Sequence, residues 1–164
     1  MRAPAAPVFA DVAGLRSHID AQPSRRVVLA NGCFDVLHVG HVRYLAGARA
    51  LGTRLIVAVN GDRSAARLKG AGHPVMGEAD RARLLAALRA VDAVVVFEDP
   101  TVDALLETLE PHVHAKGTDY RRDNVPERAA AQSLGIETAI AGDAKAHASR
   151  DLVRLVRERR TGRA

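Results

Sequence analysis

Short apolar runs alternate with amphipathic helical patterns along most of this chain, and this alternation restricts the folds open to it. The runs with the length and composition of buried strands are Val27–Ala30, Leu55–Asn60, Ala93–Phe97, Val113–Lys116 and Glu137–Ile140. The helical patterns cover Asp11–Ala21, Gly40–Leu51, Asp80–Ala90, Val102–Leu109, Glu127–Leu134 and Arg150–Arg160. Alternating elements of this kind predict an α/β fold: a Rossmann-like, doubly wound parallel sheet of about five strands with helices on both faces.

The pattern also predicts how the chain is organised. Residues 1–24 are expected to form an N-terminal tail, loose and rich in proline and alanine, followed by one short helix. Residues 25–164 carry the alternating pattern without an internal repeat, so we expect them to form one domain. Residues 61–77 are polar and contain several glycines, which predicts a long loop after the second strand.

Composition and charge indicate the cell compartment and exclude several classes of partner. The single cysteine, Cys33, excludes an internal disulfide and is typical of a reducing cytoplasm. No signal-peptide pattern and no apolar run of membrane-spanning length is present, so we expect a cytoplasmic protein without a membrane partner. The net charge is +5, but no aromatic residues are interleaved with the basic ones, which argues against nucleic acid. This surplus of positive charge suits polyanionic small-molecule substrates instead.

The sequence His38-Val39-Gly40-His41 lies where the first domain strand gives way to a helix. Free backbone N–H groups and the positive end of the helix dipole attract anions at such a place. Gly40 allows a phosphate to approach the backbone, and two imidazoles there can donate hydrogen bonds to phosphate oxygens. A zinc site is the alternative, but two histidines and one cysteine provide too few ligands. The pattern therefore predicts nucleotidyl transfer.

The segment Asn31-Gly32-Cys33-Phe34-Asp35 directly before these histidines completes a motif that resembles the signature of the cytidylyltransferase-like nucleotidyltransferases. Further similarity lies in Leu55–Asp62, Arg67–Gly70, Asp80-Arg81 and Val113–Tyr120. Within that superfamily the motifs are most similar to the adenylyltransferases that act on D-glycero-β-D-manno-heptose 1-phosphate. The resemblance runs from about Val27 to Val156, so it identifies residues 25–164 as the nucleotidyltransferase domain.

The resemblance implies a role for each matching residue. The residues with an implied catalytic role are His38, His41, Lys69 and Arg81. The residues implied to bind the nucleotide are Asn31, Gly32, Cys33, Phe34, Asp35, Gly40, Lys116, Gly117, Asp119, Ser149 and Arg150. The residues implied to bind the acceptor are Asn60, Asp62 and Tyr120.

Several of these residues have a purely structural alternative. Phe34 and Cys33 also suit packing positions, Asp35 and Asp62 also suit a turn cap and a helix cap, and Ser149 also suits an N-cap. Arg81 lies near a helix N-terminus, where a cation is unfavourable unless an anion is close by. His112 and His114 are expected to be structural histidines.

The stretch before the last helix departs from the family pattern. Family members carry a Ser/Thr-rich string there, but Lys145–Asp151 retains a hydroxyl only at Ser149. Lys145, His147 or Arg150 could supply the missing phosphate contacts, which leaves the affinity for a triphosphate open.

The resemblance implies a reaction in which ATP and heptose 1-phosphate form ADP-heptose and pyrophosphate, with Mg²⁺ accompanying the triphosphate, in a homodimer. One alternative is a cytidylyltransferase that uses CTP and glycerol 3-phosphate or another alcohol phosphate. The other is a nucleotide-binding domain without catalytic activity. The side chains do not distinguish the bases, because base selection in this superfamily depends largely on backbone groups.

Overall fold

The computed structural model describes residues 5–22, 26–98, 101–143 and 149–160. Within these ranges the strands form one parallel sheet of six strands, in the order β1-β4-β3-β2-β5-β6. The strands are β1 (Val8–Phe9), β2 (Val27–Gly32), β3 (Arg54–Asn60), β4 (Ala93–Phe97), β5 (Val113–Gly117) and β6 (Glu137–Ala141). The predicted doubly wound α/β fold is confirmed, with one strand more than expected.

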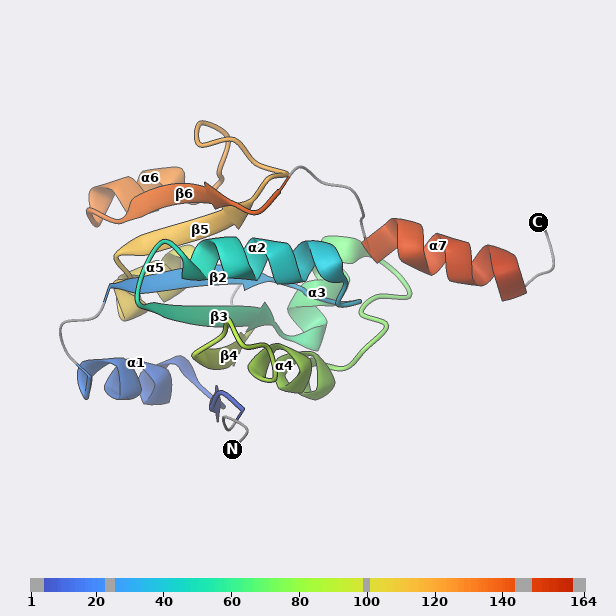
Figure 1. Cartoon of the computed structure of the whole chain (residues 1–164), viewed down its shortest axis with the longest axis horizontal. Helices are drawn as coiled ribbons and strands as arrows, with labels where there is room; N and C mark the ends of the chain where they lie inside the picture. Colours follow the sequence, from blue (N-terminus) through green and yellow to red (C-terminus); the bar gives the residue numbers. More distant parts are fainter. Residues whose placement is uncertain (1–4, 23–25, 99–100, 144–148, 161–164) are drawn as a thin grey trace.

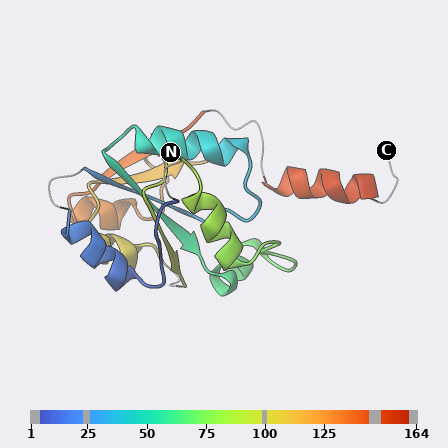
Figure 2. The ribbon, with the colours of Figure 1, turned by 60° about the horizontal axis from the view of Figure 1, so that its bottom comes forward.

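Helices cover both faces of the sheet (Figures 1 and 2). The helices in the described ranges are α1 (Val12–Asp20), α2 (Val39–Arg49), α3 (Asp62–Lys69), α4 (Glu78–Ala86), α5 (Asp103–Leu109), α6 (Arg128–Ser133) and α7 (Ser149–Arg160). Helices α2 and α4 pack on one face, whereas α1, α5 and α6 pack on the other. None of these helices is long and apolar enough to span a bilayer.

Each central strand supplies both cores because successive side chains point to opposite faces. In β2, Val28 and Ala30 join the core beneath α2 and α4, whereas Val27 and Leu29 join the core beneath α1 and α5. Burial on both faces explains why these strands are continuously apolar in the sequence instead of alternating with polar residues.

The structure corrects two expectations about local structure. Val8 and Phe9 are not part of a loose tail, because they pair with Val94 and Val95 at the edge of the sheet. A strand of two residues is too short to give a periodic signal in the sequence, and its position depends on the partner strand. The sheet therefore includes β1, which precedes residue 25, the expected first residue of the domain.

The second correction concerns the predicted loop at residues 61–77, since Asp62–Lys69 forms helix α3. Its buried side chains are the small Ser64 and Ala65, and its N-cap, Gly61, makes no side-chain cap bond. Neither an apolar stripe nor a capping side chain therefore marks this helix in the sequence.

The order of the strands places a topological switch point between β2 and β5. The chain passes from β2 to β3 and β4 on one side, and then returns to β5 on the other side of β2. Ligands in such sheets bind at the carboxyl ends of the strands beside the switch point. Helix α7 lies beyond the carboxyl ends of β2 and β3 and extends away from the body (Figure 1).

Candidate functional site

The two histidines of the motif form the N-terminal cap of α2. The backbone N–H of Gly40 donates to His38 Nδ1 at 3.1 Å, and the backbone N–H of His38 donates to His41 Nδ1 at 3.4 Å. The two imidazole rings lie with their centroids 4.0 Å apart. The helix cap therefore holds both rings side by side at the carboxyl end of β2, next to the switch point.

These cap bonds also decide which ring nitrogen carries the proton. A nitrogen that accepts a hydrogen bond from a backbone N–H has no proton of its own, so each neutral ring carries its proton on Nε2. Both imidazoles are thus donors through Nε2 at the N-terminus of a helix, where the backbone dipoles favour an anion. Two adjacent donors of this kind can stabilise negative charge on a phosphate.

Phe34 packs against the His41 ring of this pair. Its ring lies edge-on to the His41 ring with centroids 5.3 Å apart, and its side chain is buried. The backbone of Phe34 has a φ of 47°, an unusual value for a residue other than glycine. A Cβ atom at Gly32 would lie 3.2 Å from the Phe34 ring, so the turn after β2 depends on both residues. Phe34 occupies the packing position that was one of its two interpretations.

Asp35 is fully buried and holds a distant loop in place. Its carboxylate accepts hydrogen bonds from the backbone N–H groups of Val75 and Met76, at 2.6 and 3.1 Å. His73 Nδ1 lies 2.7 Å from the other carboxylate oxygen. Asp35 therefore anchors the loop between α3 and α4 and does not cap its own turn.

The pKa of Asp35 is lowered below its ordinary value. Burial by itself raises this pKa, but the hydrogen bonds from His73 and from two backbone N–H groups, together with the nearby Lys69 charge, outweigh burial. Because the pKa is lower in the folded state, the ionised carboxylate stabilises the fold above the unfolded-state pKa of about 4. This contribution is lost as the pH falls through the folded-state value.

We therefore expect Asp35→Asn to lower the free energy of unfolding by about 2 kcal/mol at neutral pH. The difference from the wild-type chain should narrow as the pH falls below about 4 toward the lowered folded-state pKa of Asp35, because the unfolded state then takes up a proton before the folded state does. Urea unfolding over that pH range measures it. Asp123→Asn makes the same change at an exposed position and should have little effect. A loss of unfolding free energy that is the same at every pH would contradict the lowered pKa assigned to Asp35.

Arg81, on α4, is the largest fully buried side chain and joins three segments around the site. Its Nη1 donates to the carbonyl oxygens of Cys33 and Asn60 at 2.6 and 2.7 Å. Its Nη2 forms an ion pair with Asp62 at 2.7 Å, and its Nε donates to the Met76 carbonyl. The anion predicted beside Arg81 is thus a carboxylate of the protein. These contacts join the ends of β2 and β3, and the catalytic role of Arg81 stays a prediction.

Asn60 is also occupied by protein contacts. Its Nδ2 donates to Ser64 Oγ at 2.8 Å, and the Cys33 thiol lies 3.8 Å from its Oδ1. Burial raises the pKa of the Cys33 thiol. Asn60 and Cys33 therefore brace the ends of β2 and β3, where the sequence predicted contacts with acceptor and nucleotide.

On the other side of the switch point, Lys116 lies at the end of β5. Its side chain is buried, and its Nζ lies 3.4 Å from Asn31 Oδ1 and 3.2 Å from a Glu127 carboxylate oxygen. The Tyr120 ring lies under the same ammonium group, with its centroid 4.9 Å away. Glu127 gave no motif signal in the sequence, since only the tertiary structure places it beside Lys116.

The remaining candidates occupy the same end of the sheet with fewer described contacts. Lys69 ends α3, Gly40 lies in the first turn of α2, Gly117 ends β5, and Asp119 follows it in a turn. Ser149 and Arg150 begin α7, but their side chains lie outside the described part of the chain, as do Lys145 and His147. Most of the stretch that departs from the Ser/Thr-rich pattern, Lys145–Asp151, thus lies outside the described residues.

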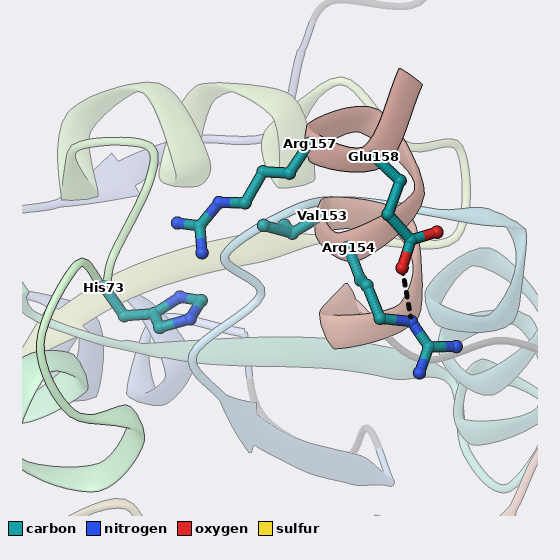
Figure 3. Close-up of a pocket in the computed structure, with 5 residues that line it drawn as sticks. All are labelled: His73, Val153, Arg154, Arg157 and Glu158. Carbon is teal, nitrogen blue, oxygen red and sulfur yellow. Dashed lines mark ion pairs between the residues drawn. The ribbon is translucent and has the colours of Figure 1, made fainter. Parts of the chain in front are cut away.

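A pocket of about 270 Å³ lies between α7 and the loop that Asp35 anchors. Its lining residues are His73, Val153, Arg154, Arg157 and Glu158. Figure 3 shows Arg157 extending toward His73, whereas Arg154 turns to Glu158 with an ion pair of 3.7 Å. Neither His73 nor Arg157 lies in a sequence motif that predicts chemistry, so only the tertiary structure brings them together.

Among the described residues, no group of three histidine, cysteine or acidic side chains could hold a metal ion. Asp62, whose carboxylate is 48% exposed, is already paired with Arg81. The described side chains therefore do not build a metal site of their own, and we assign none of them to Mg²⁺.

Comparisons with known proteins match most of this chain. The family model described as "Cytidylyltransferase-like" matches residues 29–160. "Bifunctional protein HldE" of Geotalea uraniireducens is 51% identical over 111 residues, 68% of this chain and 23% of that protein. The protein of the same name from Pelobacter propionicus is 42% identical over 143 residues, 86% of this chain and 29% of that protein. The chain thus spans about a quarter of the length of these relatives.

Solved structures show the same fold. A lipopolysaccharide core biosynthesis protein from Thermoplasma volcanium has a TM-score of 0.65 and 26% identity, covering 74% of this chain and 100% of that one. A pantothenate synthetase from Thermus thermophilus has a TM-score of 0.58 and 20% identity, covering 84% of this chain and 61% of that one. The second likeness concerns the fold alone.

Proposed function

Because the chain belongs to the cytidylyltransferase-like family, we propose that it joins the AMP of ATP to D-glycero-β-D-manno-heptose 1-phosphate and releases pyrophosphate. The observation that carries this proposal is the capped histidine pair, whose Nε2 donors lie together at the switch point. The choice of ATP and heptose 1-phosphate is supported by the similarity to the HldE proteins over most of this chain.

In the proposed reaction an oxygen of the sugar phosphate attacks the α-phosphorus of ATP. A new P–O bond forms, the bond between the α-phosphorus and the bridging oxygen of the β-phosphate breaks, and pyrophosphate leaves with the electron pair. The attacking phosphate is already ionised, so no general base is needed. Catalysis then depends on holding two anions in line and on stabilising the charge that builds up in the transition state.

The residues of the site have different roles in this reaction. His38 and His41 donate through Nε2 to the phosphate oxygens, and Lys69, at the end of α3, adds positive charge near Cys33 and Asp35 of the same motif. Arg81 and Asp35 hold the loops that surround this position. Mg²⁺ would enter with the triphosphate and neutralise part of its charge, held mainly by phosphate oxygens and water. The heptose and ATP are thus bound by a framework that the protein has already organised.

The test is a pyrophosphate-release assay with Mg²⁺, in which ATP, CTP, GTP and UTP are each offered with heptose 1-phosphate and with glycerol 3-phosphate. We expect turnover with ATP and heptose 1-phosphate, and background rates when either is omitted. Turnover with CTP and glycerol 3-phosphate would move the chain to the cytidylyltransferase alternative. Binding of ATP without turnover on either acceptor would contradict the proposed reaction and favour the non-catalytic alternative.

A further inference from the structure

A buried polar cluster lies next to Asn31, on the side away from the carboxyl ends of the strands. His114, on β5, is completely buried and pairs in register with Leu29 of β2. Its Nε2 lies 2.9 Å from Asn31 Oδ1, and Lys116 Nζ lies 3.4 Å from the same oxygen. His114 is too deep in the sheet to reach a ligand directly, but it contacts a residue at the edge.

The protonation state of His114 follows from its surroundings. Desolvation, together with the nearby Lys116 charge, lowers the pKa of His114 to about 3, so the ring is neutral at physiological pH. A neutral imidazole has one donor and one acceptor nitrogen. An amide oxygen only accepts hydrogen bonds, so Nε2 carries the proton and Nδ1 carries a lone pair.

Two donors therefore converge on Asn31, and both require an oxygen atom. If the amide were turned over, its NH₂ group would face the Nε2–H of His114 and the ammonium of Lys116. The amide is thus held with Oδ1 toward the sheet interior and Nδ2 directed away from both donors. No acceptor among the described residues bonds to this Nδ2 group.

Stability alone does not account for an imidazole at position 114. Its Nδ1 is buried and has no hydrogen-bond partner within the described part of the chain, which is unfavourable for the folded state. A leucine of similar size would fill the same space without an unsatisfied polar atom. The feature that a leucine would remove is the second donor to Asn31.

We propose that His114 is a positioning residue that orients the Asn31 amide, so that Asn31 Nδ2 donates a hydrogen bond to an oxygen of the bound nucleoside triphosphate. This inference rests on the proposed function, because it assumes that the triphosphate lies at the carboxyl ends of β2 and β5. His114 acts only through Asn31 and makes no contact with the nucleotide.

The experiment compares His114→Leu, His114→Gln, Asn31→Ala and the double variant with the wild-type chain, using calorimetric titration with ATP and thermal unfolding. We expect His114→Leu to weaken ATP binding about 5- to 20-fold, since coupled neighbours commonly interact at this level. Its melting temperature should stay the same or rise, because the unsatisfied Nδ1 is gone. His114→Gln places an amide donor near the position of Nε2, so it should bind within about twofold of wild type.

The double variant shows whether His114 works through Asn31. Adding His114→Leu to Asn31→Ala should weaken ATP binding no further than Asn31→Ala alone. Wild-type affinity in His114→Leu, or an undiminished further loss in the double variant, would overturn the inference while leaving the proposed function intact. If the wild-type chain itself binds no nucleotide, the proposed function fails and this inference fails with it.

Discussion

Replacing His41 with alanine is expected to lower kcat by about 10²- to 10³-fold, while ATP binding is only weakened. The variant removes an Nε2 donor that the helix cap holds in place, and it also removes the acceptor for the His38 backbone N–H. Donors of this kind matter most when charge develops on the phosphate in the transition state. The measurement is steady-state pyrophosphate release, combined with calorimetric titration of ATP.

The matched control is His112→Ala. His112 lies just before β5, at the opposite end of the strand from the site, and its Nδ1 accepts a hydrogen bond from the Val27 backbone N–H. This variant loses a histidine and a backbone acceptor, as His41→Ala does, but we expect it to retain kcat. An unchanged kcat in His41→Ala, or equal losses in the two variants, would contradict the role assigned to the histidine pair.

Replacing Arg81 with methionine is expected to lower the free energy of unfolding by about 3–5 kcal/mol. The side chain is of similar length and apolar, so packing is largely kept. The carbonyl oxygens of Cys33, Asn60 and Met76 lose their donor inside the protein, and Asp62 loses its ion-pair partner. Urea unfolding, with circular dichroism as the signal, measures the loss.

Arg83→Met is the control, because it makes the same change on the same helix at an exposed position. Arg83 is 79% exposed, and its ion pair with Asp80 spans 3.5 Å. Exposed pairs of this kind contribute little, so we expect a change within about 0.5 kcal/mol. Similar stabilities for Arg81→Met and Arg83→Met would show that the contacts of Arg81 do not hold the site together.

Much of the fold could be predicted because the central strands are buried on both faces. Their continuous apolar runs and the amphipathic helices between them were visible without any tertiary information, and the family resemblance pointed the same way. Strand β1 and helix α3 were missed for the opposite reason. Val8 and Phe9 become a strand only through pairing with β4, and α3 buries only small side chains.

For the candidate site, the sequence indicated the histidine pair more clearly than the surrounding polar residues. The histidine pair was found because a local motif at a strand-to-helix turn carries both its position and its chemistry. Arg81 and Asn60 were chosen as ligand contacts, but the structure commits their polar atoms to other parts of the protein. Their partners lie far away in the sequence or on another element, and a local pattern does not show which polar atoms are already occupied.

The sequence by itself determined the strand–helix alternation, the family, and the cap motif that contains His38 and His41, because each depends on residues close together in the chain. Only the tertiary structure decided which polar side chains brace the site and which remain available to a ligand. His114 illustrates the difference: its place in the strand was predicted, but its contact with Asn31 arises from the pairing of β2 with β5. Hydrogen bonds between distant segments depend on the register of the sheet, which no single segment encodes.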